Sequence, residues 1–153
     1  MKAHRIRAAQ FLPVAPAEAW GFFSNPRNLP RITPPWLSFE VLSDPPDRMY
    51  PGLLIEYRVR PLWGIPLRWL TEITHVVEPC LFVDEQRLGP YRLWHHQHRF
   101  RAAGGGVEME DEVHYLLPGG PAGRVAHALL VRRRLEEIFL YRRAAVERMF
   151  VGG

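Results

Sequence analysis

Polar and apolar residues alternate along several stretches of the chain, a period typical of β-strands with one buried face. The first such stretch covers residues 4–12 and ends before Pro13. Pro16 stands where a helix can begin, because the N–H that proline lacks would have no partner at the first helical position. Residues 17–23 therefore predict a short helix, stopped by Asn25-Pro26, and residues 27–33 predict a second short helical turn.

The period of two returns after Pro34-Pro35 and continues through the middle of the chain. Clusters of Pro, Gly and Asp interrupt it, and such clusters mark turns between strands. The pattern predicts six further strands, at residues 36–42, 53–59, 67–77, 81–88, 91–102 and 107–117. Because most connections between them are short, we expect consecutive strands to pair as antiparallel hairpins.

After Pro118 the period changes to that of a long helix, from residue 122 to residue 150. Its apolar residues form one stripe, made of Ala128, Val131, Leu135, Ile138, Phe139, Val146 and Met149. One amphipathic helix of this length can cover a face of a seven-stranded sheet, and the twist of such a sheet curls it around the helix. We therefore predict a single α+β domain over residues 1–153, with a space between sheet and helix.

Charges specify the register of the last hairpin. A turn at Gly104-Gly105 gives three polar cross-strand pairs, which are Arg101 with Glu108, Arg99 with Glu110, and Gln97 with Glu112. Opposite charges across a pair contribute ~0.2–1 kcal/mol each. A slip by one residue would bury the glutamates instead. These pairs therefore predict the solvent face of the hairpin.

The inner face of the same hairpin is aromatic and apolar, with three polar exceptions. It carries the pairs Phe100 with Met109, His98 with Asp111, His96 with Val113, and Trp94 with Tyr115. Buried polar groups are costly without partners, so His96, His98 and Asp111 must interact with one another or with a ligand. On the preceding strand, Asp84 and Gln86 share a face with Phe82 and join this group if Phe82 points inward.

Four roles are open to this polar group. A His98–Asp111 pair could hold the sheet together and do nothing else. The group could orient the polar end of an apolar ligand. His98, tuned by Asp111, could act as a general base for a cyclisation or dehydration. Two histidines and a carboxylate are also the ligands of a non-haem iron site, although adjacent His95 and His96 do not have a metal-binding spacing.

Composition narrows the function classes. A hydrophobic fraction of 47% and a charged fraction of 24% are those of a globular domain. No apolar run approaches the ~18 residues needed to cross a bilayer. The single cysteine, Cys80, excludes an internal disulfide and a four-cysteine zinc site. The chain has no phosphate loop, dinucleotide-binding glycine motif or nucleophile elbow, so we expect no cofactor.

The net charge of +4 belongs to the C-terminal segment. From Arg124 onward the chain has seven arginines and three glutamates. The Arg132-Arg133-Arg134 run has no interleaved aromatic residues that could stack on bases, so we expect no nucleic-acid partner. We interpret this run as a solvated helix face. Contact with an anionic membrane surface, or with a protein partner, remains an alternative.

Three stretches carry a resemblance to a known family: residues 11–23, residues 28–34, and the segment from Phe82 to Pro118 that includes Asp111-Glu112-Val113-His114-Tyr115. Together with the order of elements, they resemble the helix-grip fold of the SRPBCC superfamily, which includes the START and birch-pollen-allergen-like families. The similarity is greatest to its bacterial polyketide cyclase/dehydrase-like branch. It implies a curved antiparallel sheet around a C-terminal helix, with lipids, sterols, polyketides or quinones bound beneath that helix, and no metal.

We therefore expect this chain to bind a hydrophobic small molecule, such as a lipid, a polyketide or a quinone-like compound, in that cavity. The alternative is a cyclase or dehydratase that uses His98 and Asp111 on a polyketide-like substrate. The predicted ligand-binding residues are Trp69, Asp84, Gln86, Trp94, His96, His98, Asp111, Val113, Tyr115, Phe139 and Arg142. The N-terminus has no apolar signal core, so we expect a cytoplasmic location.

Overall fold

The structure is a computed structural model that describes residues 2–151. Its first half contains β1 (His4–Leu12), α1 (Pro16–Phe23), the 3-10 helices η1 (Pro26–Ile32) and η2 (Pro35–Leu37), β2 (Glu40–Val41) and β3 (Leu54–Val59). Its second half contains β4 (Leu67–Val77), β5 (Leu81–Leu88), β6 (Leu93–Ala103), β7 (Gly106–Leu116), α2 (Gly120–Ala126), the π-helical η3 (His127–Val131) and α3 (Arg132–Phe150).

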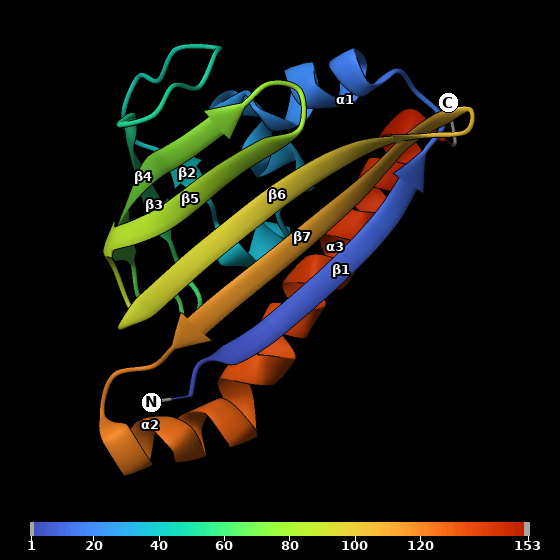
Figure 1. The fold of residues 1–153 in the computed structure, drawn as a ribbon. Helices are drawn as coiled ribbons and strands as arrows, with labels where there is room; N and C mark the ends of the chain where they lie inside the picture. The colour runs from blue at the N-terminus through green and yellow to red at the C-terminus, as the bar shows by residue number, and fades with distance from the viewer. Residues whose placement is uncertain (1, 152–153) are drawn as a thin grey trace.

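The strands form one antiparallel sheet in the order β1-β7-β6-β5-β4-β3-β2. The sheet curves around α3, which runs behind β1 and β7 in Figure 1. The first strand thus closes the sheet beside the last one, and every other neighbour is consecutive in sequence. This is the helix-grip fold that the resemblance implies.

The predicted register of the β6–β7 hairpin is confirmed. Arg101 pairs with Glu108 and His98 with Asp111, as the charge pattern indicates. Gly105 has a φ of 81°, in the left-handed region that the tight turn needs. A side chain at the next residue, Gly106, would collide with the carbonyl oxygen of Leu12 on β1.

The long helix buries Leu135, Phe139 and Val146 against the sheet, as its stripe predicts. Two residues of the predicted stripe are exposed instead, and for these the prediction is wrong. Ala128 lies in the π-helical η3, where the wider turn shifts the phase of the helix. At the far end Phe150 rather than Met149 faces inward, because its ring packs on Phe22 and Phe23 of the α1 region.

The prediction of a strand over residues 36–42 is also wrong for most of its length. Pro35 begins the 3-10 helix η2, which Ser38 closes by donating its N–H to the Pro35 carbonyl. Ser38 has a φ of 48°, which no strand tolerates. Only Glu40 and Val41 then pair with β3. Local proline geometry overrides the alternation of Leu37, Phe39 and Val41.

The two ends of the sheet differ in what they carry. Because the strands alternate in direction, the β3–β4, β5–β6 and β7–α2 connections leave at one end, which we call the α2 end (Figure 1). The β4–β5 and β6–β7 turns and the loop before β3 lie at the opposite end. Within residues 2–151, no helix combines the length and the apolar character needed to cross a bilayer.

Candidate functional site

A cavity of about 430 Å3 lies between the inner face of the sheet and the helices. This volume falls within the ~300–1,000 Å3 typical of sites for small molecules. Apolar and aromatic side chains make most of its wall, contributed by β3 to β7, by η1 and by α3. The cavity expected from the resemblance is therefore present and is not filled by side chains.

Three aromatic rings, from β4, from β6 and from the β5–β6 turn, form one wall. The Trp69 indole on β4 stands edge-on to that of Trp94 on β6, with centroids 5.1 Å apart. The Tyr91 ring lies 4.9 Å from Trp94 and 5.5 Å from Trp69. Rings at such separations attract one another beyond their burial. The wall therefore offers a rigid apolar surface for a flat or elongated ligand.

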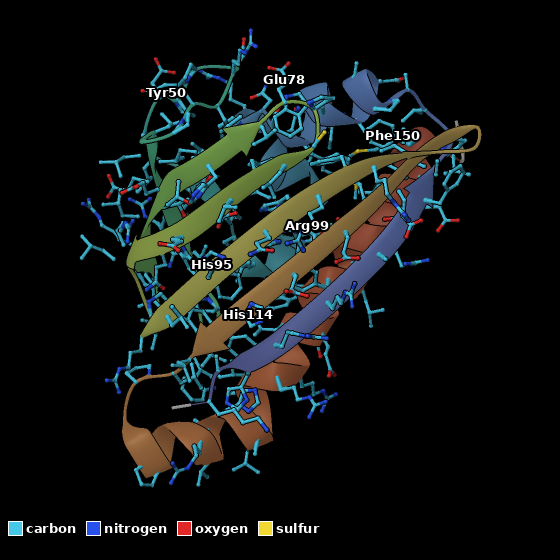
Figure 2. The ribbon with its side chains drawn as sticks, in the orientation of Figure 1. Tyr50, Glu78, His95, Arg99, His114 and Phe150 are labelled. Atoms are coloured by element: carbon cyan, nitrogen blue, oxygen red, sulfur yellow. The ribbon has the colours of Figure 1, made fainter. Side chains whose placement is uncertain are left out.

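The polar group of the cavity consists of Asp84, His96, His98 and Asp111, which we call the quartet. Register brings it together: Asp84 on β5 is opposite His96 on β6, and His98 is opposite Asp111 on β7. Residues of β6 alternate between faces, so His95 and Arg99 point outward (Figure 2) while His96 and His98 point into the cavity.

Both imidazoles bind carboxylates. Nε2 of His96 lies 2.9 Å from Oδ1 of Asp111, and Nδ1 of His98 lies 3.1 Å from the same oxygen. Nε2 of His98 lies 2.6 Å from Oδ2 of Asp84. The two rings stack with centroids 3.7 Å apart. The predicted His98–Asp111 contact is thus one part of a larger network.

Arg142 of α3 approaches the quartet from the helix side. Its Nη1 lies 4.0 Å from Oδ1 of Asp111, and its guanidinium sits over the Phe139 ring at 5.2 Å. Its side chain is 14% exposed, so it does not reach out to bulk solvent. Its Nε atom is buried and has no hydrogen-bond partner among the described residues. Arg142 itself lines the cavity, so the other nitrogens of its guanidinium can donate to a ligand oxygen.

The two histidines titrate in opposite directions. Burial lowers the pKa of His98, but the hydrogen bonds and charges of Asp111 and Asp84 outweigh it and raise the pKa above its ordinary value. Burial and the neighbouring His98 lower the pKa of His96, and the two carboxylates do not compensate fully. Near neutral pH the pair therefore favours a charged His98 beside a neutral His96.

Both carboxylates stay ionised. Burial raises the pKa of Asp111, yet the hydrogen bonds from His96 and His98 dominate and hold it well below its ordinary value. Burial also raises the pKa of Asp84, but the charges of His96, His98 and Arg142 and the hydrogen bond from His98 outweigh burial and lower this pKa below its ordinary value. Two carboxylates, one imidazolium and one guanidinium then balance to zero net charge inside the cavity.

This protonation pattern decides which atoms can meet a ligand. A carboxylate only accepts hydrogen bonds, so the proton of neutral His96 resides on Nε2, toward Asp111. Its Nδ1 keeps a lone pair and lies 3.7 Å from Asp84, too far for a hydrogen bond. Both nitrogens of His98 are engaged with carboxylates. His96 can accept and Arg142 can donate, whereas His98 has no vacant nitrogen.

Asp84, His96 and His98 also place possible metal-ligand atoms within 4.8 Å of one another. However, the imidazole planes are only 27° from parallel. Nitrogen lone pairs lie in the ring plane, so those of stacked rings run side by side rather than toward a common ion. A metal would require the rings to turn and to give up their carboxylates. We therefore interpret the quartet as a hydrogen-bonded network.

Of the predicted ligand-binding residues, eight lie on the cavity wall: Trp69, Asp84, Trp94, His96, His98, Asp111, Phe139 and Arg142. Three lie away from it. Gln86 binds the backbone of Tyr91 through both ends of its amide. Val113 is fully buried in a core cluster with Leu135, and the Tyr115 hydroxyl hydrogen-bonds to His127 at 2.7 Å. These three side chains have structural contacts of their own.

Several cavity residues were not predicted. Ile32, Thr33 and Trp36, from the region of η1 and η2, close the side of the cavity beyond β3. The proline-rich segment up to Pro35 has no apolar period that would signal an inward face, and the strand expected from Trp36 onward does not form. Tyr91 was placed at the start of a strand, and its position beside Trp69 depends on the β5–β6 turn. No local sequence signal identifies these residues.

Comparison with known proteins adds a family to this geometry. The sequence profile described as "Polyketide cyclase / dehydrase and lipid transport" matches residues 12–138. No curated protein matches the chain. Among solved structures, TTHA0849 from Thermus thermophilus has 18% identity and a TM-score of 0.69, with 97% of this chain and 98% of that one covered.

Two other solved structures are similar in fold. The major latex-like protein 151 of Panax ginseng has 10% identity and a TM-score of 0.70, with 99% of each chain covered. Protein Ms6760 from Mycobacterium smegmatis has 15% identity and a TM-score of 0.66, with 97% of this chain and 98% of that one covered. The profile spans most of the chain and the fold agrees with it, so this protein belongs to the polyketide cyclase/dehydrase and lipid transport family of the SRPBCC superfamily.

Proposed function

We propose that the protein binds a hydrophobic small molecule with a single oxygen-bearing polar end. One observation carries this proposal: the quartet and Arg142 form one compact polar group on the wall of a cavity whose other lining is mostly apolar and aromatic. A ligand oxygen could accept from Arg142, and a ligand hydroxyl could donate to Nδ1 of His96. Lipids, polyketides and quinone-like compounds combine such an end with an apolar body.

The quartet supports binding better than it supports catalysis. A general base needs a vacant nitrogen and must be neutral at its working pH. His98 does not meet the first condition, because both of its nitrogens contact carboxylates, and its raised pKa favours the charged form over the basic one. The cyclase or dehydratase alternative would therefore need the quartet to rearrange on binding. A substrate that turns over in the wild type but not in a His98→Ala variant with retained binding would favour that alternative.

The binding proposal can be tested with anilinonaphthalene sulfonate, a fluorophore with an apolar body and one anionic group. A Thr71→Phe variant fills the cavity, because Thr71 lies between Trp69 and Ile73 on the inner face of β4. Glu72→Gln on the outer face is the matched control. We expect the cavity variant to lose probe binding and the control to retain it. Equal binding by both would place the probe elsewhere and refute the proposal.

Arg142 has its own test on the same probe. Hydrogen bonds to charged groups contribute ~1.5–3 kcal/mol, so Arg142→Met should weaken binding by about tenfold or more. Arg148→Met, at an exposed position of the same helix, should leave the affinity unchanged. Native mass spectrometry of protein from its own host, followed by solvent extraction, would then identify any natural ligand as a stoichiometric apolar adduct.

A further inference from the structure

Large apolar side chains are exposed around the α2 end of the molecule. Trp63 in the β3–β4 connection is 85% exposed, and Leu129 of η3 is 77% exposed. Ile65, Leu88 and Val125 are exposed at the same end. They come from the β3–β4 loop, the end of β5 and the α2–η3 region rather than from one helix stripe.

The backbone presents Trp63 outward. Its φ is 50°, in the left-handed region that a bulky residue rarely occupies. Arg60 holds the loop in this shape by donating from Nη1 to the Gly64 carbonyl at 2.8 Å. The loop therefore keeps its largest apolar side chain in solvent against the conformational preference of that residue. Strain of this kind is concentrated at functional surfaces.

The cavity reaches the surface at this same end. Pro61 and Leu62, next to Trp63, line the cavity, as do Ala126 and Leu130 on either side of Leu129. Ala126 and Trp36 line the cavity and are also solvent-exposed. The exposed apolar residues thus border an opening through which an apolar ligand can pass. At the opposite end, the lining residues Met49, Phe100 and Met109 are buried.

Unpaired positive charge is concentrated at this same end. Segments 59–68, 88–93 and 116–131 of the α2 end contain four arginines and no aspartate or glutamate. Among these, Arg60, Arg92 and Arg124 form no ion pair within residues 2–151. At the opposite end, by contrast, the exposed acids Asp44 and Asp47 pair with Arg27, and Glu78 pairs with Arg48, so the charges there are largely balanced. Figure 2 shows Tyr50 and Glu78 at that end, away from α2.

We propose that the α2 end docks on an anionic phospholipid bilayer, which supplies or receives the ligand of the cavity. The inference rests on the proposed function, because ligand transfer gives the surface its purpose. Trp63 and Leu129 would enter the interfacial region, where indole rings and aliphatic side chains are stabilised. Unpaired arginines around them would contact anionic headgroups, each contributing to attraction at the membrane surface.

A bilayer fits these residues better than a protein or nucleic-acid partner does. The exposed apolar residues come from the β3–β4 loop, the end of β5 and the α2–η3 region, and unpaired arginines lie in the same segments, a combination suited to an interface with an apolar layer beneath an anionic one. A nucleic acid would need several stacking rings, but the exposed residues named at this end include only two aromatic ones, Trp63 and Trp36. The unpaired arginines of the α2 end, set against the paired charges of the opposite end, would also orient the molecule with its cavity opening toward the anionic surface.

The test is co-sedimentation with vesicles of phosphatidylcholine alone and of equal parts phosphatidylcholine and phosphatidylglycerol. We expect the wild type to bind only the anionic vesicles, and added salt to weaken that binding. Arg124→Glu changes the charge by two, which predicts about 25-fold weaker partitioning from the contribution of each charge at a membrane surface. Arg148→Glu, near the opposite end of α3, should have a much smaller effect.

The apolar contribution is tested by a double variant, Trp63→Ser with Leu129→Ser. Its matched control, Tyr50→Ser with Val77→Ser, removes exposed apolar residues at the opposite end. We expect the first to abolish vesicle binding and the second to preserve it. Equal loss in both, equal binding to neutral vesicles, or no vesicle binding by the wild type would overturn the proposal. A protein captured through Trp63 and Leu129 without vesicle binding would assign the surface to that partner and overturn it too.

Probe binding by the same variants separates this inference from the proposed function. Trp63 and Leu129 are exposed, so their replacement should leave the folded state and the cavity intact. Vesicle binding that fails while Thr71→Phe still abolishes probe binding would refute membrane docking alone. Absence of any cavity-dependent probe binding would instead refute the proposed function.

Discussion

Replacement of Asp111 by asparagine is the sharpest perturbation of the quartet. Oδ1 of Asp111 is the common contact of His96, His98 and Arg142, at 2.9, 3.1 and 4.0 Å. The side chain is only 13% exposed, so solvent cannot replace the lost charge. Removing one partner of a buried ion pair costs about 3–5 kcal/mol. Asparagine keeps the shape and one acceptor, so we expect a loss near the lower value, about 3 kcal/mol.

The neighbouring Glu110 provides the control. It lies one residue away on β7 and therefore faces solvent, where it pairs with Arg7 at 3.0 Å. Exposed pairs of this kind contribute ~0–1 kcal/mol. Glu110→Gln should therefore change the free energy of unfolding by less than about 1 kcal/mol. The comparison isolates burial, because both changes replace one carboxylate by its amide on the same strand.

The assay is urea unfolding at neutral pH, followed by tryptophan fluorescence. Asp111→Asn should lower the midpoint without changing the slope, because the surface exposed on unfolding is the same. The reasoning is refuted if the Asp111 variant is as stable as the wild type or loses no more than the Glu110 variant. Either result would mean that water or movement of Arg142 compensates the charge, and that the quartet is not a coupled buried network.

Other predictions concern the same interior. In urea unfolding, Phe139→Ala should lower the free energy of unfolding by about 3 kcal/mol, the low end for a buried phenylalanine, because the ring already borders a cavity. Leu140→Ala, at a side chain that is 67% exposed, should change the free energy of unfolding by no more than about 0.5 kcal/mol. In an NMR titration the His98 ring should titrate above the ordinary pKa of histidine. The contribution of His98 to the free energy of unfolding should be complete below that ordinary pKa and should be lost as the pH rises through the raised pKa of the folded state. Asp84 and Asp111 have lowered pKa values in the folded state, so their contribution to stability should be present above the ordinary carboxyl pKa and lost as the pH falls through the folded pKa. Thermal unfolding across that acidic range measures this loss, and a melting temperature that does not change with pH would contradict it.

The polar group of the site could be predicted largely because hairpins are local. The charges of Arg101 and Glu108 specify the register, and a period of two then places His98 and Asp111 together on the inner face. The same alternation placed Trp69 and Trp94 correctly on the cavity wall. Arg142 could be anticipated because it follows Phe139 by one helical turn. Each of these inferences needs only neighbours along one or two elements.

Other residues could not be placed in this way. Val113 and Tyr115 share the inner face of β7 with Asp111, yet they pack into a core cluster beneath the N-terminal part of α3. Alternation gives the face of a residue and not its position along a curved sheet. The strand predicted at Trp36 became η2 because two prolines and a left-handed Ser38 determine the local backbone. That segment then supplies part of the cavity wall.

The sequence by itself therefore determined the order of elements, the hairpin register, the inward His and Asp residues and the family resemblance. All of these depend on periodicity and charge over short separations. Only the tertiary structure decided that Asp84 closes the quartet, that Nε of Arg142 lacks a partner among the described residues, and that the cavity stays open toward the α2 end. These features depend on how far the sheet curves away from the helix, which is set by packing between residues distant in sequence.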